Sequence, residues 1–271
     1  MSEHPLAGAV EKFNRAKEQF DELGTEMEGF FNGEPKPYAS VGEFDTEAWE
    51  WVERLQVIRE PPLRFGVILG DCLHNLRSCL DHVIWQVTLL DGGTPDDRTQ
   101  YPIASKSEAQ FEAIANDRIP DLNAKHRAMV KKTQPYHRGD EASSHPLAML
   151  ATLSNTDKHQ VVHTAHSIVG YDAKASLDKL VGSAQQEGPT PVVGWWLASA
   201  GRLDHGTPWF RIVWDPAEEP PREVNVGGDF ITEPAFGEVG LPASELPKIA
   251  EAVRGVMQAF LAQFPETKWA D

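Results

Sequence analysis

The segment from Pro61 to Leu90 constrains the fold most, because it has the apolar spacing of one long helix. Its apolar residues recur at intervals of three and four, between Pro61-Pro62 and the turn signal Asp91-Gly92-Gly93. The apolar face consists of Leu69, Leu73, Leu76, Cys79, Leu80, Val83 and Val87. A face of this width is typical of a helix that packs in a core, so the segment predicts a helical bundle.

The same periodicity predicts three further long helices and two short ones. The long helices are expected at Pro5–Phe31, Pro146–Gly170 and Ser244–Phe264, and the short ones near residues 107–116 and 121–132. Capping residues and Pro or Gly punctuation support these boundaries.

Strand signals are concentrated in the second half of the chain. Residues 192–197 and 209–214 are β-branched and aromatic, with Gly206 and Pro208 between them, which is typical of a hairpin. A further strand is expected near 222–232, and residues 38–59 predict a short hairpin or extended segment. Residues 171–190 give no clear pattern.

The expected fold class is therefore α+β: mainly a bundle of four long helices with a small antiparallel β insertion. The 271 residues are expected to form a single domain. Residues 1–170 and 241–271 would form the bundle, and residues 171–240 the strand-rich insertion.

Composition limits the binding partners and the cellular compartment that we expect for the protein. Its formal net charge of −16 disfavours non-specific binding to nucleic acid or to an anionic membrane. No apolar run is long enough to span a bilayer, and the first residues do not resemble a secretory signal. Cys72 and Cys79 are expected to be small buried hydrophobes in a reducing compartment, so we expect a cytoplasmic protein that does not contact membranes.

The opposite face of the Pro61–Leu90 helix is polar in an unusual way. It carries Asp71, His74, Asn75, Arg77, Ser78, Asp81 and His82. A solvated helix face is usually rich in Lys and Glu, but this one has neither and instead carries groups that transfer protons and bind anions. The alternative is that this face packs against other helices through hydrogen bonds, with Arg77 and Asp81 as an i,i+4 ion pair.

A second polar group lies on the expected helix at Pro146–Gly170. Asn155, His159, His163 and His166 would share one face of it. His159 and His163 have the i,i+4 spacing of metal ligands, so a metal site at these residues is an alternative. The sequence has no cysteine cluster or His-Glu-x-x-His motif to support it.

A local basic stretch is the other candidate binding feature. From Leu122 to Gly139 the chain contains no acidic residue but carries Lys125, Arg127, Lys131, Lys132 and Arg138. These residues would either guide a nucleic-acid backbone or form a solvated surface.

The stretch Leu73–His82 contains Arg77, four intervening residues and His82, and it resembles the signature of HEPN domains (higher eukaryotes and prokaryotes nucleotide-binding). Many members are metal-independent endoribonucleases of toxin–antitoxin and phage-defence systems. The resemblance implies that Arg77 binds the scissile phosphate and that His82 transfers protons, in a site shared between two protomers. The chain also resembles uncharacterised bacterial proteins that pair this segment with an Asn-x-Asp-Lys-His group, here Asn155–His159.

The leading hypothesis is a homodimeric HEPN-like endoribonuclease or RNA-binding protein that needs no cofactor and acts in stress or phage defence. The catalytic candidates are Arg77, His82, His74 and Asp81. The candidates for substrate binding are Asn75, Ser78, Asn155, Lys158, His159, Lys131 and Lys132.

Two alternatives belong to other classes of protein. One is a metal-binding hydrolase that uses His74, Asp81, His82, His159 and His163. The other is a non-enzymatic interaction module, in which the acidic surface and the tryptophans Trp195, Trp196, Trp209 and Trp214 bind a partner.

Overall fold

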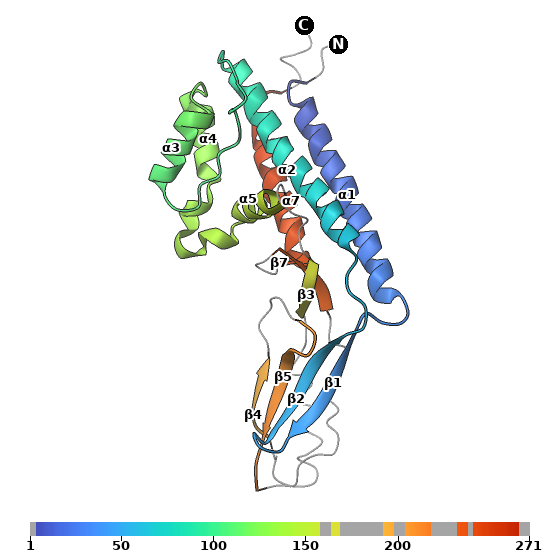
Figure 1. Ribbon diagram of the computed structural model, residues 1–271. Helices are drawn as coiled ribbons and strands as arrows, with labels where there is room; N and C mark the ends of the chain where they lie inside the picture. Colours follow the sequence, from blue (N-terminus) through green and yellow to red (C-terminus); the bar gives the residue numbers. More distant parts are fainter. Residues whose placement is uncertain are drawn as a thin grey trace. The chain divides into compact units, whose positions relative to one another are not determined.

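Helices and antiparallel strands form separate parts of the computed structural model, which describes residues 4–157, 164–168, 192–197, 204–217, 232–237 and 241–265. The fold class is α+β, as expected (Figure 1). The chain divides into two compact units. The helical unit consists of Met1–Thr25, Arg64–Val162 and Glu245–Asp271, and the sheet unit of Glu26–Leu63 and His163–Ser244.

This division differs from the expected one mainly in residues 26–63, and at its edges in residues 163–170 and 241–244, all of which belong to the sheet unit. Residues 26–63 belong there because the hairpin that they contain pairs with the later strand at Pro208–Trp214.

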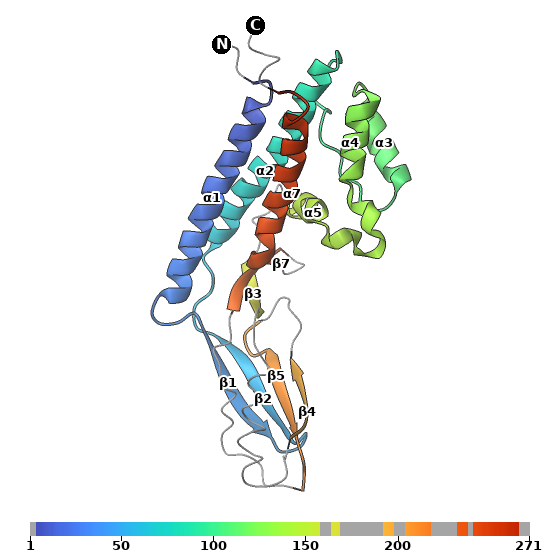
Figure 2. The ribbon, with the colours of Figure 1, turned by 180° about the vertical axis from the view of Figure 1, so that it is seen from behind.

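Three long helices run alongside one another in the helical unit (Figures 1 and 2). They are α1 (Ala7–Asn32, of which the first part belongs to this unit), α2 (Leu63–Leu90) and α7 (Leu246–Leu261). All three match expected helices. The whole predicted apolar face of α2 is buried, and each large aliphatic side chain buried in this way contributes about 2 kcal/mol.

The two cysteines of α2 lie in the contacts between these helices. The Cys72 thiol donates to the Ala16 carbonyl of α1 at 3.4 Å, and the Cys79 Sγ lies 3.7 Å from the Met257 Sδ of α7. Burial raises the pKa of Cys79 to about 12. Both residues are fully buried free thiols, which confirms that they act as small hydrophobes.

Shorter helices complete this unit: α3 (Glu108–Arg118), α4 (Ala124–Lys132), the 3-10 segment η1 (Pro135–Ser144) and α5 (Pro146–Asp157). The helices α3 and α4 confirm the two short helices. Ser107 and Asn123 cap them, each accepting a backbone N–H from the residue three positions further along the chain.

The prediction of a long helix through Gly170 is wrong. Thr164–Ile168 is a strand, β3, paired antiparallel with β6 (Thr232–Phe236). The sequence from Val161 to Val169 is rich in β-branched residues, which favour extended backbone over helix. The described residues therefore do not confirm the bundle of four long helices. His166 pairs with Pro234 in the sheet, so it does not extend a helical row of histidines.

The sheet unit contains two antiparallel sheets. The larger has the order β1-β2-β5-β4, with β1 at Tyr38–Asp45, β2 at Glu50–Val57, β4 at Val192–Leu197 and β5 at Pro208–Trp214. Both expected hairpins are confirmed. The smaller sheet has the order β3-β6-β7, with β7 at Leu241–Pro242, and the 3-10 turn η2 (Ala243–Glu245) leads into α7. The strand expected near 222–232 falls outside the described residues, except for Thr232.

Glycine is required at position 42 of β1. A Cβ atom there would lie 2.3 Å from the Trp51 Cζ2 and 2.6 Å from the Glu53 Oε1. The buried Glu53 carboxylate accepts the Trp51 indole N–H at 2.8 Å and a hydrogen bond from the Ser40 hydroxyl. Gly42 thus leaves the space in which this buried carboxylate finds its partners.

Two helices start with the same three residues, His-Pro-Leu, and the same cap. The Nδ1 atoms of His4 and His145 each accept the backbone N–H of the leucine two positions on, Leu6 and Leu147, at 3.1 Å. The imidazole occupies the position of a side-chain acceptor at the helix N-terminus. The bond requires an unprotonated Nδ1, and a protonated ring would also be repelled by the helix dipole.

We expect the His145 cap to make folding sensitive to acid. Burial, followed by the charges of Arg138 and His137, lowers the pKa of His145. Below about pH 6.5 the unfolded chain therefore binds a proton that the folded protein does not, and stability falls as the pH drops.

Urea unfolding of wild type and His145→Asn at pH 7.5 and 5.5 measures this effect. Asparagine keeps a cap without a titrating group. The wild type should lose more stability between the two pH values than the variant does, and an equal loss in the two proteins would contradict the prediction.

Candidate functional site

The polar face of α2 divides between two neighbouring elements. Asn75 faces α1: its amide donates to the Gln19 Oε1 at 2.9 Å, and its Oδ1 accepts from the Lys12 Nζ at 3.3 Å. Asn75 therefore joins two helices of the core. It does not line the pocket that contains Arg77.

Arg77 and Asp81 hold the segment that follows α2. The Arg77 Nη2 lies 3.1 Å from the Asp81 Oδ1 and donates to the Tyr101 carbonyl at 2.7 Å. The same Asp81 oxygen accepts the Tyr101 backbone N–H at 2.8 Å. Their side chains are only 18% and 27% exposed. The i,i+4 ion pair that the alternative interpretation required is thus present, and it binds both the backbone N–H and the backbone carbonyl of Tyr101.

Gln134 binds the backbone of the same segment, and no sequence pattern predicts this role. Its Oε1 accepts the Ala104 N–H at 2.8 Å, and its Nε2 donates to the Pro102 carbonyl at 3.0 Å. The Tyr101 hydroxyl shares a short hydrogen bond with Thr133, and burial raises the pKa of Tyr101. Residues 101–104 are therefore rigid, because helix α2 and Gln134, which follows α4, both bind their backbone.

A pocket of about 480 Å³ opens beside this rigid segment. It is lined by Arg77 of α2, by Gln100, Tyr101, Pro102 and Ile103, by Ala113, Ile114, Asp117 and Arg118 of α3, and by Ala151, Ser154 and Asn155 of α5. Its volume is typical of sites for small molecules and cofactors. Two of the predicted residues, Arg77 and Asn155, are brought together here, and we call this site the arginine pocket.

Both arginines of the pocket retain guanidinium donors. The described contacts of Arg77 use only Nη2. Arg118 uses Nε toward Asp117 at 3.0 Å and Nη1 toward the Arg98 carbonyl at 3.3 Å. Within the described residues, the Arg77 Nη1 and the Arg118 Nη2 make no hydrogen bond, so each arginine has a donor left for a ligand. Asn155 adds an exposed amide.

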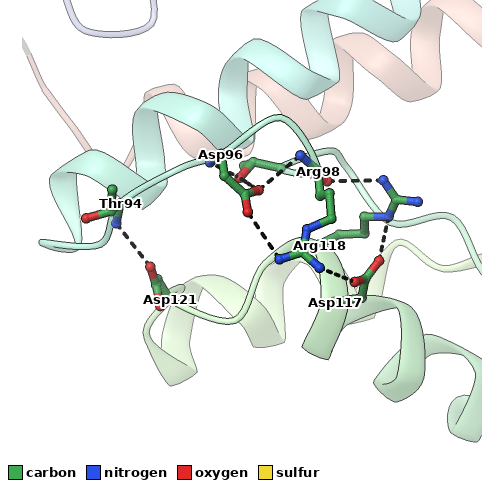
Figure 3. A network of polar contacts seen from close by, with 7 residues as sticks. Thr94, Asp96, Arg98, Asp117, Arg118 and Asp121 are labelled. Carbon is green, nitrogen blue, oxygen red and sulfur yellow. Dashed lines mark hydrogen bonds and ion pairs between the residues drawn. The ribbon is translucent and has the colours of Figure 1, made fainter.

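A network of ion pairs positions Arg118 (Figure 3). Arg98 contacts Asp96 and Asp117, each at 3.3 Å, and Asp117 also accepts from Arg118. The backbone N–H of Thr94 donates to Asp121 at 3.0 Å. These contacts attach the chain after α2 to helix α3. Both segments line the arginine pocket, so the network holds two of its sides together.

His82 lies outside the arginine pocket. It lines a second hollow of about 310 Å³, together with Asp81, Trp85, Gln86 and Thr99. Arg77 and His82 therefore line different hollows. His74 is exposed, and its Nε2 lies 3.5 Å from the Ser78 hydroxyl. Neither histidine shares a pocket with Arg77, so the predicted catalytic pair is not assembled within one chain.

Two of the five basic residues of the basic stretch, Arg127 and Lys131, are paired with acidic residues of the preceding helix. Lys131 contacts Glu108 at 2.5 Å and Glu112 at 2.9 Å, and Arg127 contacts Glu112 at 2.7 Å. The pKa of Lys131 is raised, and its hydrogen bond to Glu108 is the largest cause. The pKa of Glu112 is lowered, and the hydrogen bond that it accepts from Lys131 is the largest cause. Lys131 thus joins α3 to α4, whereas Lys132 is exposed.

The described residues give no support to the metal alternative. They contain no group of three or more His, Cys, Asp or Glu side chains that could hold an ion. Lys158, His159 and His163 lie outside the described residues.

The tryptophans of the sheet unit divide into two kinds. Trp209 and Trp214 are buried, whereas Trp196 is 49% exposed, with the Arg211 guanidinium 5.7 Å from the centre of its ring. The Trp195 side chain lies outside the described part of the structure. Two of the four tryptophans are therefore sheet core and not a surface for a partner.

Comparison of the chain with protein-family models, with curated proteins and with solved structures gives no match. Among the described helices, none is both long and apolar enough to cross a membrane.

Proposed function

We propose that the protein is a HEPN-like RNA-binding protein that binds a nucleotide phosphate in the arginine pocket. The observation that carries the proposal is the presence of two arginines with unused guanidinium donors in one pocket. Arginine stays charged and matches the geometry of phosphate oxygens, which makes it the usual residue for this task. The Asn155 amide supplies a further hydrogen-bonding group for a sugar or a base.

The charge around the pocket favours a small, local contact with RNA. Asp81 and Asp117 offset much of the positive charge of Arg77 and Arg118. The chain as a whole carries −16, which repels a long nucleic acid. We therefore propose that one phosphate, or a short single-stranded stretch, is recognised. Apolar side chains such as Ile103 and Ile114 offer a surface for the attached sugar or base.

Replacing Arg118 tests phosphate binding without disturbing the core. Arg118→Gln should weaken the affinity for a short single-stranded RNA about tenfold, as expected for the loss of one charged hydrogen bond. The slope of log K against log[salt] should become shallower by about 0.7, the single-strand value for one phosphate. Fluorescence anisotropy over a salt series measures both quantities.

Arg98→Gln is the matched control. Arg98 contacts the same Asp117 and is more exposed than Arg118, but it does not line the pocket. Its replacement should change the affinity less than twofold. Equal losses in the two variants would show that the ion-pair network, and not a phosphate contact of Arg118, determines binding.

The endoribonuclease activity that the HEPN resemblance implies requires a second copy of the chain. We propose that Arg77 of one copy and His82 of the other act on the same phosphate in a homodimer. The 2′-oxygen attacks phosphorus as its proton leaves to a base, and the bond to the 5′-oxygen breaks as that oxygen is protonated. The products are a 2′,3′-cyclic phosphate and a 5′-hydroxyl. His82 suits the proton transfers because an imidazole ring can both accept and donate a proton.

Mixing two inactive variants tests the shared site. Arg77→Ala and His82→Ala should each fail to cleave labelled tRNA in EDTA. If they are unfolded and refolded together, the mixed dimers contain one site with both native residues, so part of the activity should return. Gel analysis of the fragments and their cyclic phosphate ends measures this, with each variant refolded alone as the control. No recovery, with mixed dimers shown by mass spectrometry, would contradict the shared site.

A further inference from the structure

The hollow that contains His82 carries chemistry that the arginine pocket does not use. Its lining consists of Asp81, His82, Trp85 and Gln86 of α2 and Thr99 of the following segment. Asp81 separates it from the arginine pocket, since this residue contacts Arg77 at 3.1 Å. One ion pair therefore stands between two neighbouring hollows, and we call the second one the Trp85 hollow.

Trp85 presents a stacking surface in this hollow. Its side chain is 39% exposed, although the rest of the apolar part of α2 is mostly buried. An exposed indole is costly in water, but nucleic-acid bases stack on aromatic side chains of this kind. The exposed ring therefore fits a flat aromatic ligand.

Asp81 presents an acceptor beside that ring. Its contacts with Arg77 and with the Tyr101 N–H both use Oδ1. In the described residues its Oδ2 makes no hydrogen bond, and the side chain is 27% exposed. The Asp81 carboxylate, paired with Arg77, accepts hydrogen bonds and donates none.

A carboxylate beside a stacking ring distinguishes between the bases. Guanine is the only standard base with two adjacent N–H donors, N1–H and the N2 amino group, on its pairing edge. Adenine and cytosine place a ring acceptor next to their amino group, and uracil places its single N–H between two carbonyls. A carboxylate therefore attracts guanine and repels the acceptors of the others. The Gln86 amide, also in the hollow, supplies a donor for the guanine O6.

We infer that the Trp85 hollow is a guanine subsite, in which Trp85 stacks on the base and Asp81 accepts its N1–H and N2–H. This inference rests on the proposed function, in that the neighbouring phosphate would occupy the arginine pocket. It adds a sequence preference: the protein binds RNA at a guanosine.

Dinucleotides that differ in one base test the subsite on the unaltered protein. The probes are GpU, UpG, IpU, UpI and UpU, measured by isothermal titration calorimetry. Inosine has the shape of guanosine but lacks the N2 amino group. We expect the better of the two guanosine dinucleotides to bind about tenfold more tightly than UpU. Its inosine counterpart should lose most of that preference.

Two variants attribute the preference to this hollow. Trp85→Leu should abolish the difference between guanosine and uridine dinucleotides, whereas Trp85→Phe keeps an aromatic ring and should retain part of it. Both should leave the affinity for UMP unchanged, because Trp85 does not line the arginine pocket. Since Trp85 is exposed, both variants should unfold at the wild-type temperature.

The outcomes separate the subsite from the phosphate pocket. If UMP binds but guanosine, inosine and uridine dinucleotides bind equally, the guanine subsite is overturned and the phosphate pocket stands. A second outcome is that UMP fails to bind, whereas a guanosine dinucleotide binds to the wild type and not to Trp85→Leu. In that case the phosphate pocket is overturned and the guanine subsite stands. If guanosine is preferred but Trp85→Leu keeps the whole preference, the base is read elsewhere and the inference is wrong.

Discussion

Replacing Arg77 with alanine should both destabilise the protein and weaken RNA binding at least as much as Arg118→Gln does. The Tyr101 carbonyl would lose its donor, and the half-buried Asp81 carboxylate would lose its counter-charge. Together these losses should lower the free energy of unfolding by about 2–3 kcal/mol. The arginine pocket would also lose one of its two phosphate donors. Urea unfolding and anisotropy with a short RNA measure the two effects.

Two further variants separate these roles of Arg77. Arg77→Lys keeps the charge but not the forked geometry, so it should restore most of the stability and little of the affinity. Asp81→Asn keeps an acceptor for the Tyr101 N–H and leaves the guanidinium in place, so it should weaken phosphate binding less than Arg77→Ala does. An Arg77→Ala protein that binds RNA normally in its folded state would show that this arginine is purely structural.

The division of α2 into two faces is predictable because burial follows the local period of the helix. The core residues from Leu69 to Val87 and the polar residues from His74 to His82 lie where a periodicity of 3.6 places them. The contact partner of each polar residue, in contrast, does not follow from the local period of the helix. Asn75 turns toward α1, whereas Arg77 and Asp81 turn toward the chain around Tyr101. These partners are remote in sequence.

The wall of the arginine pocket was missed for a physical reason. Its rigid part is main chain, the peptide groups of Tyr101 and Pro102, and a backbone acceptor leaves no signature in the residue type. Gln134 was missed as well, since one glutamine in a polar stretch gives no sign that both ends of its amide are buried and paired.

The helix expected through Gly170 shows how far periodicity alone can be trusted. The segment after Asp157 repeats histidines at helical intervals, but it also contains β-branched residues from Val161 onward. Tertiary pairing decided the outcome, because β6 offers β3 a complete antiparallel partner. A periodic row of polar residues predicts a helix less reliably than a periodic row of apolar residues does. An apolar row must be buried, so a structure that breaks it loses free energy, whereas a polar row can be exposed in any conformation.

The second large effect is expected at the end of α2, where Asp91 joins three elements. Its side chain is only 4% exposed. Both of its oxygens lie 2.9 Å from the His126 Nδ1, and they accept the Asn123 backbone N–H at 2.9 Å and its amide at 2.6 Å. The His126 ring in turn packs on Phe260 and Phe264, with ring centres 5.9 and 5.5 Å away. Asp91 thereby connects α2, the start of α4 and the end of α7.

Asp91→Ala should lower the free energy of unfolding by about 3–5 kcal/mol. It would leave the buried His126 ring and the two Asn123 donors without their carboxylate acceptor, which is the costly way to break such a pair. Asp97→Ala, an exposed aspartate six residues further along the chain, is the control and should stay within about 0.5 kcal/mol of wild type. Denaturant unfolding of both variants measures the difference.

The same variant distinguishes a stabilising cluster from a functional one. The buried His–Asp pair resembles a proton-transfer pair in composition, but it lines neither the arginine pocket nor the Trp85 hollow. If its role is stability alone, Asp91→Ala studied well below its unfolding temperature should bind short RNA with wild-type affinity. A folded Asp91→Ala protein that loses RNA binding would place this cluster in the site and contradict that assignment.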